Sequence, residues 1–283
     1  MRFKVLLSIF FIFTNLDFVS AETVPVWSTN QKVVIVVLEN TDYQDAIKQP
    51  FLNRLANEGV LFTNFHAIGH PSQPNYITMV AGDKLGVSGD GRYDLNSTNI
   101  ADLLEAKGLT WKVYAEQFPG KCSLVDKKSK YVRKHNPLIN FKNIQSNPVR
   151  CANIVDSTAF TTDFKNGRLA NYNMYIPNLD NDGHDTTPAY ADQFMQKIFG
   201  PMLNDAQMMK DVLFIVLYDE DEHLFTGTNQ IYTVMYGPGV KIGTEVSTRY
   251  DHYSLLRTIE DGFQLGHLGR KDATASPLVG FWQ

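Results

Sequence analysis

Val33-Val-Ile-Val-Val-Leu38 runs without a break into Glu39-Asn40. Six apolar, mostly β-branched residues in a row are typical of a strand that is buried on both faces, as in a parallel sheet. Glu39 and Asn40 would then lie at the carboxyl end of the strand, which is the edge where open α/β sheets bind ligands. A strand that ends in an ordinary polar turn explains the same residues, so Glu39 and Asn40 indicate a functional site only if other functional residues are predicted to lie beside them.

The same pattern recurs late in the chain. Val212 to Tyr218 is a second apolar stretch, and it runs directly into Asp219-Glu220-Asp221-Glu222. Because the carboxyl ends of parallel strands meet at one edge of a sheet, the two junctions can bring acidic side chains from distant parts of the sequence together.

Strands and helices alternate along the rest of the chain. Strands are expected at 33–38, 111–114, 172–176, 212–218 and 231–236, and helices at 51–57, 74–81, 100–106, 190–199 and 253–263. This order predicts an α/β fold, with a mostly parallel sheet covered by helices on both faces. No repeat or linker divides residues 22–283, which we expect to form a single domain. Its least regular part, about 117–161, is expected to be an inserted region on the substrate side.

Residues 1–21 have the features of a secretory signal peptide. Two basic residues precede an apolar stretch from Val5 to Phe13, and Val19-Ser20-Ala21 is a small-x-small cleavage pattern. The apolar stretch is too short to span a bilayer, which disfavours a retained anchor. We therefore expect a secreted or periplasmic protein with no integral membrane segment after signal removal.

Composition predicts a globular protein that does not bind nucleic acid. Hydrophobic residues make up 43% of the chain, which is enough for a core, and the net charge of -4 offers no attraction to a polyanion. The densest basic stretch, from Lys127 to Lys134, is expected to be a solvated face, with an anionic substrate or a lipid surface as the alternative. Cys122 and Cys151 bracket that stretch and, in an exported chain, predict one disulfide.

Ser72 is the first candidate for chemistry. It stands in Pro71-Ser72-Gln73-Pro74, just ahead of a predicted helix, with a proline suited to the first helical turn. A serine there lies near free backbone N–H groups and the positive end of the helix dipole, which favour a phosphate or an oxyanion. The commoner use of such a serine is as a helix N-cap.

A second candidate lies in the polar segment after the strand at 172–176. Counted from Asp180, an EF-hand would need glycine at the sixth position and glutamate at the twelfth, but the chain has Asp185 and Ala191 there. What remains is Asp180-x-x-x-His184, a ligand pair suited to a divalent transition metal. A solvated turn is the alternative explanation.

Two further histidines are candidates. His252 opens the last predicted helix, where the helix dipole disfavours its cationic form and so suits a neutral ligand. His135, which follows the basic stretch, is a candidate for contact with a phosphate.

Together these motifs resemble the phosphoesterase family of the alkaline phosphatase superfamily, which contains bacterial phospholipase C enzymes and secreted acid phosphatases. The resemblance extends over nearly all of residues 22–283 and implies an alkaline phosphatase-like, three-layer α/β/α sandwich. The motifs, in order, are Glu39-Asn40, Ser72-x-Pro-Asn75 running on to Met79-Val-Ala-Gly82, Pro177-Asn-Leu-x-x-Asp182-Gly-His184-Asp185, Tyr218-Asp219-Glu220 and Asp251-His252.

The resemblance implies roles for individual residues. Ser72 matches a nucleophile that forms a phosphoserine, and a serine without a visible Ser-His-Asp arrangement is activated most simply by a metal ion. The implied ligands of a divalent metal ion are Glu39, Asn40, Ser72, Asp219 and Glu220. Asn40 is alternatively a donor to a phosphoryl oxygen, and His184 and His252 are candidates for stabilising charge or protonating the leaving oxygen. A second metal site, or a phosphate site, would use His184 and His252 with Asp180, for which Asp182 and Asp185 are alternatives.

Two of the implied ligands depart from the two-zinc pattern of the superfamily. Glu220 stands where those enzymes use histidine, and Glu39 where they use aspartate. Both changes favour a cation that prefers oxygen ligands, and they leave the identity and number of the metal ions open.

Three functions are compatible with the sequence. The leading hypothesis is a secreted, metal-dependent acid phosphatase that hydrolyses phosphomonoesters. The second is a phospholipase C or another phosphodiesterase, with a phospholipid as one substrate, because the same core can cleave either ester. The third is a non-catalytic, metal-dependent binding protein, which the retention of the serine, the amide and both carboxylate pairs disfavours.

Overall fold

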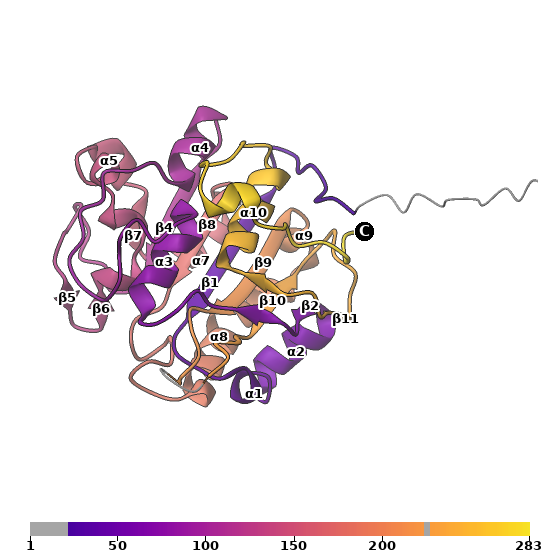
Figure 1. Ribbon diagram of the computed structural model, residues 1–283. Helices are drawn as coiled ribbons and strands as arrows, with labels where there is room; N and C mark the ends of the chain where they lie inside the picture. Colours follow the sequence, from indigo (N-terminus) through magenta and orange to yellow (C-terminus); the bar gives the residue numbers. More distant parts are fainter. Residues whose placement is uncertain (1–21, 224–226) are drawn as a thin grey trace, which may run out of the picture.

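The computed structural model describes residues 22–223 and 227–283, so the predicted signal peptide at 1–21 lies outside the described residues. Its centre is an eight-stranded sheet with the order β11-β2-β10-β9-β1-β8-β4-β7 (Figure 1). The strands are β1 (Lys32–Leu38), β2 (Val60–Phe62), β4 (Trp111–Ala115), β7 (Ile154–Asp156), β8 (Tyr172–Ile176), β9 (Val212–Tyr218), β10 (Thr233–Tyr236) and β11 (Thr244–Val246).

The sheet is mostly parallel, as predicted, and its register places the two acidic junctions side by side. β1 is parallel to both β8 and β9, while β10 runs antiparallel to its neighbours β9 and β2. Leu38 pairs with Tyr218, so Glu39 and Asp219 leave the sheet as neighbours. The apolar residues of β1 and β9 are almost completely buried, as expected for central strands that are covered on both faces.

Helices cover both faces of the sheet, which confirms the α/β/α sandwich. On one face, α3 (Ser72–Ala81) lies beside α10 (His252–Gly262) (Figure 1). On the other, α7 (Thr158–Lys165) and α8 (Pro188–Leu203) pack Phe160 and Phe199 edge-on against Tyr175 of the sheet. The remaining α-helices are α1 (Tyr43–Ala46), α2 (Pro50–Glu58), α4 (Ile100–Ala106), α5 (Lys142–Gln145), α6 (Pro148–Cys151) and α9 (Ala206–Met209).

Several predicted boundaries differ from the structure, most of them by one or two residues, and the helix expected at 190–199 extends to Leu203. The helix expected at 74–81 begins at Ser72, and the helix expected at 190–199 begins at Pro188 because the Thr187 side chain caps its N-terminus. The strand expected at 231–236 starts two residues later, at Thr233, since the N–H of Ile231 donates to Phe65 instead of joining the sheet. Phe65 belongs to the short strand β3 (Phe65–His66), which pairs with β12 (Tyr250–Asp251).

The region 117–161 carries the predicted disulfide, Cys122–Cys151, and also supplies a strand, β7, to the main sheet. It holds the hairpin of β5 (Lys127–Lys128) and β6 (Tyr131–Val132), two 3-10 turns, α5 and α6 before β7 joins the sheet edge. The basic stretch is a solvated face only in part. Lys127 and Lys128 are exposed, whereas Arg133 is buried and donates to Asp94 and to the carbonyl of Tyr93. Among the described residues no helix is both long and apolar enough to cross a membrane.

Candidate active site

Ser72 is the first residue of α3, and its hydroxyl lies between two carboxylates. Its Oγ is 3.0 Å from Glu39 Oε2 and 3.2 Å from Glu220 Oε1, and the residue is only 2% exposed. One hydroxyl carries one proton, so it can donate to only one of these oxygens. Burial together with the charge of Glu39 raises the pKa of Glu220 to about 8, which favours a protonated Glu220 as the donor of the other contact when no cation is bound.

Glu39, Asn40 and Asp219 meet where β1 and β9 end. Asn40 has a φ of 32°, a left-handed conformation that asparagine tolerates better than most residues, and its N–H donates to Asp219 Oδ1 at 3.3 Å. Asn40 Oδ1 and Asp219 Oδ2 are both buried and have no hydrogen-bond partner within the described part of the chain. Two orphaned oxygen acceptors at one place indicate that something outside the chain satisfies them.

The site concentrates negative charge that the chain does not neutralise. Glu39, Asp219 and Glu220 are at most 1% exposed, and burial, reinforced by their mutual repulsion, raises the pKa of each carboxyl. The Tyr76 hydroxyl donates to Glu39 Oε1 at 2.5 Å. Lys134 attracts the cluster, but its ammonium is held by Asp90 at 2.6 Å.

These residues fit a divalent cation. Carboxylate, amide and hydroxyl oxygens are the ligands that Mg²⁺, Ca²⁺ and Mn²⁺ prefer, and the orphaned atoms of Asn40 and Asp219 are of this kind. A bound cation would offset the repulsion among the buried carboxylates. The groups that could hold it are those predicted from the sequence, namely Glu39, Asn40, Ser72, Asp219 and Glu220.

A second group of ligand atoms adjoins this site. Glu39, His135 and Asp182 each offer one ligand atom, and these atoms lie within 4.8 Å of one another. His135 Nε2 is 3.4 Å from Glu39 Oε1, and its Nδ1 is 3.6 Å from Asp182 Oδ2. Burial lowers the pKa of His135 well below its usual value, so the ring is neutral and can act as a ligand or as a hydrogen-bond donor. The ring is also stacked on Tyr76, which fixes its orientation.

The structure does not bring Asp180, His184 and His252 together as a ligand set. Asp180 is drawn outward by Lys130, with its Oδ1 2.6 Å from the ammonium. His184 Nδ1 contacts Asp185 at 2.8 Å, although the ring lies 6.1 Å from that of His135. His252 is buried, with its Nε2 2.8 Å from the backbone carbonyl oxygen of Asp219. This contact positions the backbone of Asp219 and leaves His252 outside the ligand set. Asp182, which the sequence offered as an alternative to Asp180, is the acid that faces His135.

Sequence reasoning missed His70. Its Nδ1 lies 2.9 Å from Glu220 Oε2, and its Nε2 lies 3.3 Å from Asp221 Oδ1, so the ring orients both acids after β9. No periodic pattern marks a loop residue of this kind. Asn75 and Tyr76 carried a usable signal, because residues three and four positions after Ser72 lie on the same helix face. Asn75 Nδ2 donates to Glu220 Oε2 at 3.2 Å.

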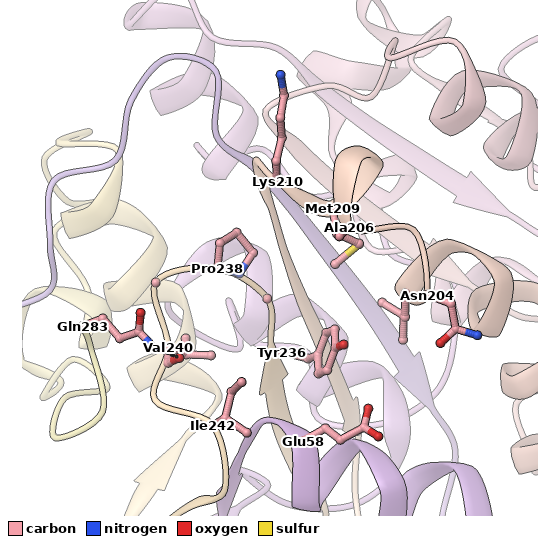
Figure 2. Close-up of a pocket in the computed structure, with 13 residues that line it drawn as sticks. Glu58, Asn204, Ala206, Met209, Lys210, Tyr236, Pro238, Val240, Ile242 and Gln283 are labelled. Carbon is pink, nitrogen blue, oxygen red and sulfur yellow. Dashed lines mark hydrogen bonds between the residues drawn. The ribbon is translucent and has the colours of Figure 1, made fainter.

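A separate cavity of about 610 Å³ lies at the opposite edge of the sheet (Figure 2). Tyr236, which lines it, pairs with Phe214 near the start of β9, whereas Asp219 follows the end of that strand. Seven residues of strand separate the two edges by about 20 Å. None of the predicted site residues lines this cavity.

Comparisons with curated proteins show similarity to phosphatases. The chain is 38% identical over 260 residues to a probable acid phosphatase of Kluyveromyces lactis, covering 88% of this chain and 62% of that protein. It is 34% identical over 255 residues to an acid phosphatase of Aspergillus fumigatus, covering 86% and 57%. A phosphatidylinositol-3-phosphatase of Mycobacterium tuberculosis is 34% identical over 256 residues, covering 88% and 82%. The chain thus spans about three-fifths of the length of these fungal relatives.

Solved structures share the fold. A protein of the alkaline phosphatase superfamily from Vibrio parahaemolyticus aligns with a TM-score of 0.62 at 14% identity, covering 91% of this chain and 72% of that one. A phosphonate monoester hydrolase from Silicibacter pomeroyi aligns with a TM-score of 0.53 at 12% identity, covering 83% and 73%. The profile of the Phosphoesterase family matches residues 26–266, and the chain therefore belongs to the Phosphoesterase family.

Proposed function

We propose that this chain is a secreted, metal-dependent phosphoesterase of the acid phosphatase type, which hydrolyses phosphomonoesters through a phosphoserine. The observation that carries the proposal is the Ser72 hydroxyl, held between Glu39 and Glu220 at the first residue of α3. A buried serine among carboxylates at a helix N-terminus suits phosphoryl transfer, and the fungal relatives are acid phosphatases by name.

In the proposed reaction, Ser72 Oγ attacks the phosphorus atom in line with the leaving oxygen. The O–P bond to serine forms as the bond to the leaving alcohol breaks, and the proton lost by Ser72 passes to a neighbouring carboxylate. Water then attacks the phosphoserine, which releases inorganic phosphate and returns the serine. A divalent cation held by Glu39, Asn40, Ser72, Asp219 and Glu220 would supply positive charge that stabilises the serine alkoxide and the phosphoryl oxygens.

The surrounding residues position these groups. Tyr76 and Asn75 donate to Glu39 and Glu220, which fixes the two carboxylates against Ser72. His135 is neutral and buried beside Glu39, where its N–H can donate to a phosphoryl oxygen. His184 is about one-third exposed and lies beside His135, a place suited to protonating the leaving oxygen.

The first test is the serine itself. Ser72→Ala should abolish turnover of a chromogenic phosphomonoester and leave the unfolding midpoint close to that of the wild type, because Ala preserves the helix and removes only the nucleophile. Ser157→Ala is a matched control, since Ser157 precedes α7 on the other face of the sheet. Acid quenching during turnover should trap phosphoserine in the wild type and not in Ser72→Ala. Near-normal activity of Ser72→Ala would refute the proposal that Ser72 is the nucleophile.

The second test separates the substrate classes and the metal requirement. Purified protein is given a phosphomonoester, a phosphodiester and vesicles that contain phosphatidylinositol 3-phosphate, each with and without a chelator, and its metal content is measured. We expect phosphate to be released mainly from the monoester. This release should stop when the chelator is present and return when a divalent metal is added. Preferred cleavage of the diester would favour a phosphodiesterase or phospholipase C. Preferred release from the vesicles would favour a lipid phosphate, as the name of the mycobacterial relative suggests. No release with any metal would favour a binding protein.

A further inference from the structure

Three ligating side chains lie together at the far end of α10 from the candidate active site. Glu260 belongs to the last turn of α10, His267 to the loop that follows, and Asp272 to a 3-10 turn at Lys271–Thr274. One ligand atom from each lies within 4.8 Å of the other two. Glu260 and His267 also line a cavity of about 510 Å³, which gives the cluster a route to solvent.

Glu260 is an unsatisfied acid inside this cluster. Its side chain is 0% exposed, and its Oε2 lies 3.3 Å from His267 Nδ1. Its Oε1 is buried without a hydrogen-bond partner in the described ranges. Burial and the nearby charge of Asp272 raise the pKa of Glu260 to about 9, which shows how poorly the chain alone accommodates the ionised form.

The neighbouring cation and backbone donors are committed to other oxygens. Arg257 directs its Nε to Asp261 and one terminal nitrogen to the carbonyl of Ala273. Asp272 is also fully buried, and its two oxygens accept from the backbone N–H groups of Leu268 and Arg270. These bonds aim the carboxylate of Asp272, but they leave the second oxygen of Glu260 without a donor.

We propose that Glu260, His267 and Asp272 bind one divalent transition-metal ion, at a site separate from the one around Ser72. Two carboxylates and an imidazole form a ligand set suited to zinc or cobalt. His267 is one-third exposed on its side chain, so an ion can reach the cluster from the cavity, and water would complete its coordination. The ion satisfies the orphaned oxygen and replaces the repulsion between the two acids with attraction.

The site would brace the two helices that carry the candidate active site. Asp272 packs so closely against Gly82, the C-cap of α3, that a Cβ on Gly82 would lie 2.3 Å from its Oδ1. The N–H of Lys271 also donates to the carbonyl of Gly82 at 3.0 Å. Ser72 begins α3 and His252 begins α10, so the ion would fix the opposite ends of both helices, about 15 Å away. We therefore assign it a structural role.

The test compares metal content in matched variants. The full protein is loaded with zinc, freed of excess by gel filtration, and analysed as wild type, His267→Ala, Glu260→Gln and His223→Ala. His223 is the control, because it too is an exposed histidine beside an acid, Asp42. We expect His267→Ala and Glu260→Gln to retain one equivalent of zinc fewer than the wild type, and His223→Ala to retain the wild-type amount. Zinc should raise the unfolding midpoint less in the first two variants than in the others.

Cobalt distinguishes this site from the one around Ser72. In an Asp219→Asn background, which impairs the other site, added Co²⁺ should give visible absorption bands that His267→Ala abolishes. Turnover by His267→Ala in the wild-type background should stay near the wild-type value. Equal zinc content in the wild type, His267→Ala and Glu260→Gln would overturn the proposal and leave the cluster as two acids that share a proton. If one variant fails to fold, the other still decides the question.

Discussion

The two edges of the central sheet differ in how much charge they bury. At the carboxyl edge Glu39, Asp219 and Glu220 are buried together, and two oxygen atoms there lack partners within the described chain. At the amino edge a cavity of about 610 Å³ is lined by Glu58 and Lys210, both of which keep contact with water (Figure 2). An open cavity costs little to form, whereas buried carboxylates without a cationic partner are costly and mark a candidate functional site. The comparison favours the carboxyl edge as the place of the proposed chemistry.

Removing one acid from each edge gives the largest expected contrast. Asp219→Asn should lower kcat/KM for a phosphomonoester by about 10³-fold or more, because it removes a ligand and a charge at the reacting centre. Glu58→Gln should change kcat/KM by less than about twofold, since this exposed side chain at the amino edge contacts neither the proposed metal ligands nor Ser72. Steady-state kinetics on both variants measures the contrast. A comparable loss in Glu58→Gln would move the site to the other edge.

A smaller effect is expected from His70, which contacts the ligands without being one of them. His70→Ala should weaken metal affinity by about 10- to 100-fold, because Glu220 and Asp221 lose the ring that orients them. His70→Gln keeps a donor toward Glu220 and should recover part of the affinity. His223→Ala is the matched control. Titration with Mn²⁺ separates this positioning role from general damage, because activity at saturating metal should recover in His70→Ala. Activity that stays low at saturating metal would contradict it.

The same acids should destabilise the metal-free protein. With a chelator present, Asp219→Asn should raise the free energy of unfolding by about 1–3 kcal/mol, since it removes one of three buried, mutually repelling carboxylates. Glu58→Gln should change it by less than about 0.5 kcal/mol. Urea unfolding in EDTA measures both values. A destabilised Asp219→Asn would mean that its hydrogen bond from Asn40 outweighs the repulsion.

The sequence predicted the carboxyl edge better than it predicted the second ligand set. Uninterrupted apolar runs located β1 and β9, so Glu39 and Asp219 could be placed at strand ends, and a proline marked the helix that begins at Ser72. The contact of His70 with Glu220 depends on how a loop folds back, which no spacing encodes. The sequence offers Asp180 as one possible ligand, with Asp182 and Asp185 as alternatives, but Asp180 forms an ion pair with Lys130, and the sequence separation of these residues hides that pair. Local patterns therefore predict elements and their ends, while side-chain pairing across loops requires the structure.

The buried carboxylates of the carboxyl edge also predict a pH dependence of the metal-free stability. Glu220 has a pKa of about 8 in the folded protein against an ordinary value of 4.5, so the folded state holds a proton that the unfolded chain releases. This stabilisation is complete below about pH 4.5 and is lost as the pH rises through about 8, with a slope of at most about 1.4 kcal/mol per pH unit for this carboxyl.

Urea unfolding in EDTA between pH 5 and 8.5 measures this slope. Glu260 has a raised pKa as well, so the comparison uses a Glu260→Gln background. There, Glu220→Gln should reduce the slope without removing it, because Glu39 and Asp219 also have raised pKa values, whereas Glu58→Gln at the amino edge should leave the slope unchanged. If the dependence of the unfolding free energy on pH is the same in Glu220→Gln, the proton taken up on folding is bound by another group. Metal binding should show the opposite trend, with affinity that increases toward pH 8, because the cation must displace that proton.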